Sequence, residues 1–191
     1  MNSVENDVKN CFDTLLNGGT ILYPTDTIWG IGCDATNEKA IEKVYNLKKR
    51  PQNKSFIVLL AEAKDILKYI ATPHPDIIDI VENFKQPTTV IYNNAIDLPE
   101  ALVHESGTIA IRVTTDPFCK ALIKRLKKPI VSTSANISGA PSPQIFKDVA
   151  SEIINGVDYV VKHRQDDDNA APPSQIIQID EHDGSIKIIR A

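Results

Sequence analysis

The stretch Lys48-Lys49-Arg50-Pro51-Gln52-Asn53-Lys54 joins a predicted helix to a predicted strand, and four of its seven residues are cations. Apolar residues at helical spacing precede it, so the sequence predicts a helix from a cap at Asn37 to about Lys49. Pro51 disfavours helical backbone at the residue before it, which is expected to end the helix there. The apolar run Phe56-Ile57-Val58-Leu59-Leu60 follows at once and predicts a buried strand.

A basic junction of this kind has two interpretations. Anion sites are commonly built on the turns between a helix and a buried strand, and both arginine and lysine bind phosphate. The alternative is a solvated helix end whose lysines complement the helix dipole. The local sequence alone does not separate the two.

Composition limits the classes of protein that this chain can belong to. Its 191 residues, 42% hydrophobic and 24% charged, predict one domain over residues 1–191 with a sizeable core. The net charge of −4 argues against a general nucleic-acid binder, although it allows a local basic site. The three cysteines and four histidines have no metal-ligand spacing, so no protein metal site is expected. A polar, acidic N-terminus and the lack of a long apolar run predict a cytoplasmic protein with no membrane association.

Helical and strand patterns alternate along the chain, but not in the regular order of βαβ repeats. This predicts an α/β fold with a mixed, twisted sheet in a single domain. Helices are expected at 4–16, 37–49, 62–69, 76–84, 117–126 and 146–154. Strands are expected at 20–23, 30–32, 55–60, 86–92, 108–113, from 130 onward, at 159–161, and as a terminal hairpin of 174–179 and 185–190.

Two further places in the sequence suggest a site. Ser132, Ser134 and Asn136 follow a buried-looking strand, and on extended backbone they would share one face. The alternative is a loop stabilised by its own side-chain hydrogen bonds. Arg112 lies in an apolar strand, where a cation is unfavourable unless it meets an anion. Its alternative is an edge strand with the arginine facing water.

Three segments together resemble the YrdC family of threonylcarbamoyl-AMP synthases. They are Tyr23-Pro24-Thr25-Asp26-Thr27-Ile28-Trp29-Gly30, the stretch from Leu47 to Lys54, and Ser132-Thr133-Ser134-Ala135-Asn136-Ile137-Ser138-Gly139. The resemblance implies a mixed sheet around a concave, basic cavity. It implies ATP with Mg²⁺, L-threonine and bicarbonate as substrates, and threonylcarbamoyl-AMP and pyrophosphate as products. A separate transferase complex would then pass the threonylcarbamoyl group to adenosine 37 of tRNA.

The resemblance also assigns roles to individual residues. The residues that would bind ATP and its phosphates, with Lys48 and Arg50 as catalytic residues, are Lys48, Arg50, Lys54, Thr108, Ser134, Asn136, Ser142 and Arg190. The residues that would hold threonine are Thr27, Arg112, Ser132 and Ser174. Asp26 would either reach magnesium through water or serve as a turn residue. Two departures from the family pattern are Asp116, where relatives often have histidine, and the acidic loop Asp166-Asp167-Asp168.

Two other functions fit part of the sequence. The first is a non-catalytic RNA-binding or ribosome-assembly module, with weak binding of tRNA or double-stranded RNA on the same basic surface. The negative net charge and the lack of interleaved aromatic residues count against it. The second keeps carbamoyl-adenylate chemistry but changes the acceptor, as in hydrogenase maturation. Dependence on threonine separates this possibility from the main hypothesis.

Overall fold

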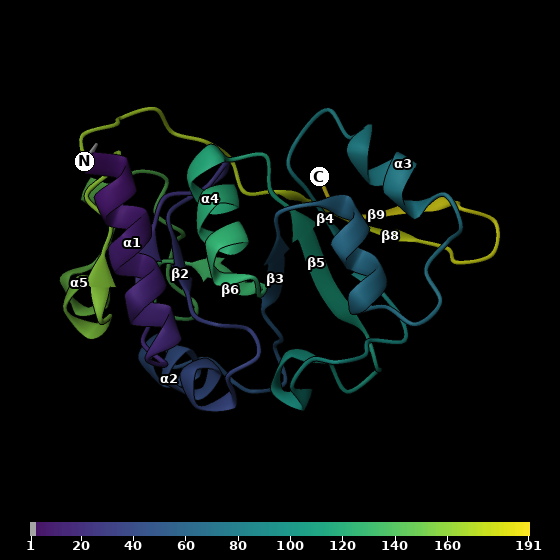
Figure 1. Cartoon of the computed structure of the whole chain (residues 1–191), viewed down its shortest axis with the longest axis horizontal. Coiled ribbons are helices and arrows are strands. Elements are labelled where there is room, and N and C mark those ends of the chain that lie inside the picture. The colour runs from purple at the N-terminus through teal and green to yellow at the C-terminus, as the bar shows by residue number, and fades with distance from the viewer. Residues whose placement is uncertain (1–2) are drawn as a thin grey trace.

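The computed structural model describes residues 3–191, in which helices and strands alternate along the chain (Figure 1). The helices, including short 3-10 helices labelled η, are α1 (Ser3–Leu16), α2 (Glu38–Lys48), η1 (Ala63–Lys68), α3 (Ile77–Glu82), η2 (Glu100–Leu102), α4 (Pro117–Leu126), η3 (Phe146–Asp148) and α5 (Ser151–Gly156). The strands are β1 (Ile21–Tyr23), β2 (Gly30–Gly32), β3 (Ile57–Leu60), β4 (Thr88–Tyr92), β5 (Ile109–Val113), β6 (Ile130–Ser134), β7 (Tyr159–Val160), β8 (Gln175–Ile179) and β9 (Ile186–Arg190).

Within residues 3–191 the strands form one nine-stranded sheet in the order β7-β1-β2-β6-β3-β5-β4-β8-β9. The pairs β1/β7, β3/β5 and β4/β8 are parallel, and the other neighbours are antiparallel. The predicted α/β fold with a mixed sheet is therefore confirmed. The predicted terminal hairpin is also confirmed, as the antiparallel pair of β8 and β9.

One face of the sheet is covered by α1 and α4, which lie side by side (Figure 1). Leu15 of α1 and Leu122 of α4 pack there with Ile21, Leu59 and Ile130 of the sheet. These three strand residues point to the same face, because side chains alternate along a strand.

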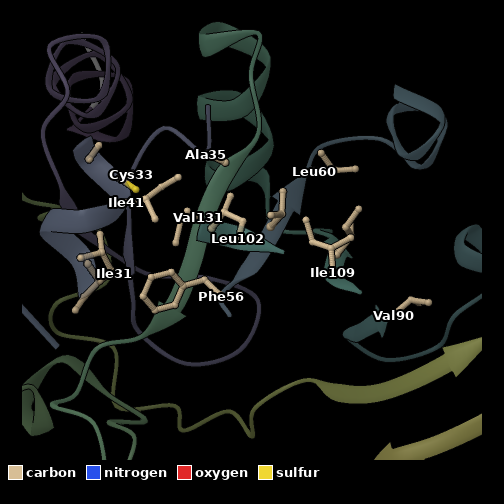
Figure 2. Packing of buried hydrophobic residues seen from close by; sticks show 14 of the residues in the cluster. Ile31, Cys33, Ala35, Ile41, Phe56, Leu60, Val90, Leu102, Ile109 and Val131 are labelled. Atoms are coloured by element: carbon tan, nitrogen blue, oxygen red, sulfur yellow. The ribbon is translucent and has the colours of Figure 1, made fainter. Parts of the chain in front are cut away.

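The opposite face carries the larger apolar cluster. α2, η1, α3 and α5 pack there against the strand residues that alternate with the first set, such as Leu22, Val58 and Val131. Figure 2 shows Val131 in this cluster, with Ile41 of α2 and Phe56 among its neighbours. Both faces of the central strands are thus buried, which explains why β3 has a continuous apolar sequence.

The helix before the basic junction begins and ends where the sequence predicts. The side chain of Asn37 accepts a hydrogen bond from the backbone N–H of Ala40, which caps α2. Lys49 is left-handed, with φ of 49°, and closes the helix. The chain then turns at Pro51 and enters β3.

Two predicted helices are wrong in type or extent. Residues 63–68 form the 3-10 helix η1 instead of an α-helix. The predicted helix 146–154 is divided into η3 and α5, because Val149 and Ala150 are extended. Phe146 packs on the ring of Trp29, with centroids 4.9 Å apart, and Val149 is buried. These tertiary contacts outweigh the local helical pattern.

The glycines of β2 are required by close packing. A Cβ atom on Gly32 would lie 2.7 Å from the ring of Tyr23 and 2.8 Å from the backbone oxygen of Val131.

None of the helices formed by residues 3–191 combines the length and apolar content needed to cross a bilayer.

Candidate functional site

A cavity of about 300 Å³ lies on the sheet face that carries α1 and α4. Arg112 of β5 pairs with Leu59, and Ser132 of β6 lies two residues beyond Ile130, so both point to this face. Leu59 and Ile130 are covered by the two helices, whereas Arg112 and Ser132 line the cavity. The cavity therefore occupies the part of the face that the helices leave uncovered.

The cavity collects most of the predicted site residues. Those that line it are Thr27, Arg50, Arg112, Ser132, Ser134, Ser142, Ser174 and Arg190. They come from the β1–β2 loop, the α2–β3 junction, β5, β6 and the loop after it, the segment before β8, and β9. That segment crosses the molecule from β7 to β8 (Figure 1).

The charge of the cavity is set by arginines. Arg50, Arg112 and Arg190 line it, and its lining within residues 3–191 includes no aspartate or glutamate. Burial lowers the pKa of Arg50 and of Arg190, and the charge of Arg112 lowers the pKa of Arg190 further. Arginine nevertheless keeps its charge at neutral pH, so the cavity suits an anionic ligand.

Arg50 is held in place by its own junction. Its Nε donates to the backbone oxygen of Lys54 at 2.8 Å, and a terminal nitrogen donates to that of Ser55 at 3.0 Å. The guanidinium carbon lies 5.2 Å from the ring centroid of Phe56, a cation–π distance. The alternative of a solvated helix end is therefore wrong for Arg50, which is half-buried against this ring.

Lys48 is buried and does not line the cavity. Its exposed fraction is 1%, and its ammonium donates to the backbone oxygens of Ser134 and, at 2.6 Å, of Asn136. Burial lowers the pKa of Lys48 to about 7, and the charge of Arg50 contributes in the same direction. Lys48 thus fixes the turn that presents Ser134 to the cavity.

Asn136, Lys54 and Thr108 also lie outside the cavity lining. β6 ends at Ser134, so only Ser132 and Ser134 share the predicted face; the Asn136 amide instead donates to the backbone oxygens of Ile137 and Ala140. The alternative of a loop with its own hydrogen bonds is therefore correct for Asn136. Lys54 is exposed, and the hydroxyl of Thr108 contacts that of Ser106 at 3.0 Å. Contact of these three residues and of Lys48 with a nucleotide stays a prediction.

Arg112 meets a carboxylate of its own chain. One terminal nitrogen donates to Asp26 Oδ1 at 2.6 Å and to Thr27 Oγ1 at 3.1 Å. β5 lies between β3 and β4, and the Arg112 side chain is 3% exposed, so the edge-strand alternative is wrong. Asp26 is therefore an ion-pair partner rather than a simple turn residue, which the sequence did not reveal.

A second ion pair supports the same loop. Arg164 donates to Asp116 Oδ2 at 2.7 Å and to the backbone oxygen of Thr25 at 3.3 Å. Thr114 Oγ1 joins the two pairs, because it donates to Asp26 and accepts from the backbone N–H of Asp116. Asp116, the residue that departs from the family pattern, thus caps α4 and anchors the segment that leads to the cavity.

Ser174 and Arg190 close the far side of the cavity. The hydroxyl of Ser174 lies 2.8 Å from that of Thr89, and a terminal nitrogen of Arg190 donates to the backbone oxygen of Ser174 at 2.5 Å. The acidic loop points elsewhere, since Asp168 pairs with Lys147 at 2.7 Å.

A larger cavity, of about 630 Å³, lies between η1, α3 and the start of α4. Its lining combines Glu62 and Glu82 with Lys64, Lys85 and Lys120, and it includes none of the predicted site residues. The smaller cavity is therefore the better candidate for a site that binds anions.

Comparison with known proteins identifies the same family as the sequence motifs do. A family model named Sua5/YciO/YrdC, with the description "Telomere recombination", matches residues 13–191. The chain belongs to the Sua5/YciO/YrdC family. Among curated relatives, the threonylcarbamoyl-AMP synthase of Pseudoalteromonas translucida is 32% identical over 162 residues, covering 83% of this chain and 87% of that protein. The protein of the same name from Idiomarina loihiensis is 32% identical over 174 residues, covering 90% and 92%.

Solved structures of the Sua5/YciO/YrdC family share the fold. P. abyssi Sua5 complexed with L-threonine matches with a TM-score of 0.83 and 21% identity over 96% of this chain. E. coli YciO matches with a TM-score of 0.78 and 20% identity, and 87% of its chain is covered. This chain spans 53% of the P. abyssi Sua5 chain.

Proposed function

We propose that this chain is an enzyme that makes threonylcarbamoyl-AMP from L-threonine, bicarbonate and ATP. The main support for the proposal is the convergence of Arg50, Arg112 and Arg190 on one cavity whose lining, among residues 3–191, contains no carboxylate. A triphosphate, a carbamate and an amino-acid carboxylate are all anions, and all would be used together in this reaction. The names of the curated relatives support the same activity.

The reaction needs positioning more than a nucleophilic side chain. The threonine amine adds to bicarbonate with loss of water, which gives a carbamate. A carbamate oxygen then attacks the α-phosphorus of ATP, the bond to the β-phosphate oxygen breaks, and pyrophosphate leaves. Fixed cations that face the phosphates would stabilise the charge on the leaving group.

The cavity suggests where each substrate lies. Arg50 and Arg190, together with Ser134 and Ser142, would contact the nucleotide. At the other side, the threonine carboxylate and hydroxyl would be bound by Thr27, Arg112, Ser132 and Ser174. Lys48 would act by holding the β6 turn that carries Ser134.

Magnesium would arrive with ATP as part of the substrate. Within residues 3–191 no cluster of three or more His, Cys, Asp or Glu residues is placed to hold a metal ion. Asp26 is engaged by Arg112 and Thr114. Phosphate oxygens and water would therefore supply most ligands of the ion, which is the usual coordination of magnesium bound to ATP.

The product would pass to a separate tRNA-threonylcarbamoyl transferase complex. We place the activity in the cytoplasm. The buried thiols of Cys11, Cys33 and Cys119 are free, which is typical of a reducing compartment. No observation favours the RNA-binding alternative, and the names of the relatives support the enzyme.

The test is direct identification of the product. The protein is incubated with MgATP, L-threonine and ¹³C-bicarbonate, and the mixture is analysed by mass spectrometry. A threonylcarbamoyl adenylate that carries the ¹³C label supports the proposal. A labelled adenylate that forms equally without threonine would show that threonine is not the amine used, and would overturn the proposal. If no labelled adenylate forms with folded protein, the proposal is wrong.

A further inference from the structure

The carboxylate of Asp26 is held on both of its oxygens. Oδ1 accepts from Arg112 at 2.6 Å. Oδ2 accepts from Thr114 Oγ1 at 3.2 Å and from the backbone N–H and hydroxyl of Thr115 at 3.1 and 3.4 Å. The three donors to Oδ2 belong to the two residues that directly follow β5, the strand that carries Arg112. Asp26 is therefore fixed with respect to the arginine that it binds.

Arg112 has donors left over after this pairing. Its Nε is buried and has no hydrogen-bond partner within residues 3–191. The side chain is 3% exposed and lines the cavity, whereas Asp26 does not line it. Both side-chain hydrogen bonds of Arg112 within residues 3–191 use one terminal nitrogen, so the other terminal nitrogen remains for a ligand in the cavity.

Holding Arg112 in one orientation before the ligand arrives lowers the entropy cost of binding. A free arginine side chain loses rotamer entropy when it binds a ligand, and a group fixed in advance does not. The bonds from one terminal nitrogen to Asp26 and Thr27 hold the guanidinium and leave its other terminal nitrogen for the cavity. Two carboxylates can share one guanidinium in this way, because it has five N–H groups.

We propose that Asp26 is a positioning residue that sets Arg112 for the α-carboxylate of the amino-acid substrate, and so selects substrates in which this carboxylate is free. The inference rests on the proposed function, since it assumes that threonine is the amino acid bound. Asp26 acts through Arg112 and touches no reacting atom.

The test compares two ligands that differ only at the carboxylate. L-threonine and L-threonine amide are titrated into the full chain by calorimetry without nucleotide, and ATP is titrated separately. Loss of one charge-assisted hydrogen bond predicts that Asp26→Asn binds threonine at least about tenfold more weakly. The preference for threonine over its amide should fall by a similar factor, while ATP affinity changes by less than about twofold. A merely structural role of Asp26 would not change the preference.

Asp34 provides a matched control. Its carboxylate is 5% exposed, pairs with Lys128 at 2.7 Å, accepts from Thr36, and does not line the cavity. Asp34→Asn removes the same charge, and we expect it to leave the preference unchanged. Asp26→Glu, which keeps the charge, should recover part of the preference. Thr114→Val removes one donor to Asp26 and should lower the preference in the same direction by a smaller factor.

The outcomes separate this inference from the proposed function. A wild-type preference in Asp26→Asn, together with a lost preference in Arg112→Ala, overturns the inference and leaves the function standing. If Asp26→Asn does not fold, an unchanged preference in Thr114→Val overturns the inference. A wild-type protein that binds threonine neither alone nor with MgATP, and forms no labelled adenylate, overturns both.

Discussion

The ammonium of Lys48 lies 2.6 Å from the backbone oxygen of Asn136, so the end of α2 is tied to the turn after β6. The same ammonium also binds the backbone oxygen of Ser134, whose side chain faces the cavity. One buried cation thereby joins two of the three segments that resemble the YrdC family. The first effect of removing Lys48 should be on the shape of this turn.

Replacement of Lys48 by methionine is expected to destabilise the protein. The variant keeps an unbranched side chain of similar length but removes the Lys48 donor from the backbone oxygens of Asn136 and Ser134. The Ser134 oxygen still accepts from the backbone N–H of Asn136, so the expected cost is about 1–3 kcal/mol in the free energy of unfolding. Lys49→Met is the matched control, because Lys49 is exposed and pairs with Glu152 on the surface. An exposed pair contributes less than about 1 kcal/mol. Urea unfolding of the two variants checks the difference, and equal stabilities would contradict the role given to Lys48.

The contribution of Lys48 to stability should depend on pH. Its pKa falls from 10.5 to about 7 on folding because the side chain is buried. The unfolded chain then binds more protons than the folded chain between these values, so the free energy of unfolding rises with pH across that window. The slope for one group is at most about 1.4 kcal/mol per pH unit.

The measurement is urea unfolding of wild type and Lys48→Met at pH 7 and pH 9. The stability difference between them should grow with pH, while other titrating groups cancel. A difference that stays constant would mean that the two backbone oxygens keep Lys48 protonated throughout.

Arg50→Lys should weaken use of ATP although it keeps the charge. Lysine cannot make both backbone contacts or stack on Phe56, so the cation would no longer be fixed at the cavity. We expect kcat/KM for ATP to fall by about 10–100-fold. Arg125→Lys is the control, since Arg125 stacks on Phe12 at 5.1 Å and lies outside the cavity lining. Equal effects of the two changes would remove Arg50 from the nucleotide site.

Arg112→Ala should affect both threonine use and stability. It leaves Asp26 as a buried charge without its cation, which costs about 3–5 kcal/mol. The KM for threonine should rise more than the KM for ATP, and steady-state kinetics with each substrate varied gives the two values. An equal rise in both would assign Arg112 to the nucleotide.

The sequence predicted the elements around the basic junction because their signals are local. Asn37 and Pro51 mark the ends of α2 by capping and steric effects within a few residues. The serines of β6 could be assigned to one face by strand alternation alone. The helix predicted at 146–154 was wrong because contacts with Trp29, distant in sequence, decide its conformation.

The sequence could not predict in the same way where the side chain of Lys48 points, or which residue forms the ion pair with Arg112. Lys48 binds acceptors 86 and 88 residues further along the chain, and Asp26 lies 86 residues before Arg112. The four cations between Lys48 and Lys54 have the same local pattern whether they face solvent or the core. The resemblance to the YrdC family supplied residue roles, but it did not reveal which cation would be buried.

The measurement that tests the central claim most directly is release of pyrophosphate from MgATP in four mixtures: complete, without threonine, without bicarbonate, and with serine in place of threonine. The account predicts rapid release only in the complete mixture, with weaker release when serine replaces threonine. Release that is indifferent to threonine or bicarbonate would contradict it, as would the absence of release from folded protein.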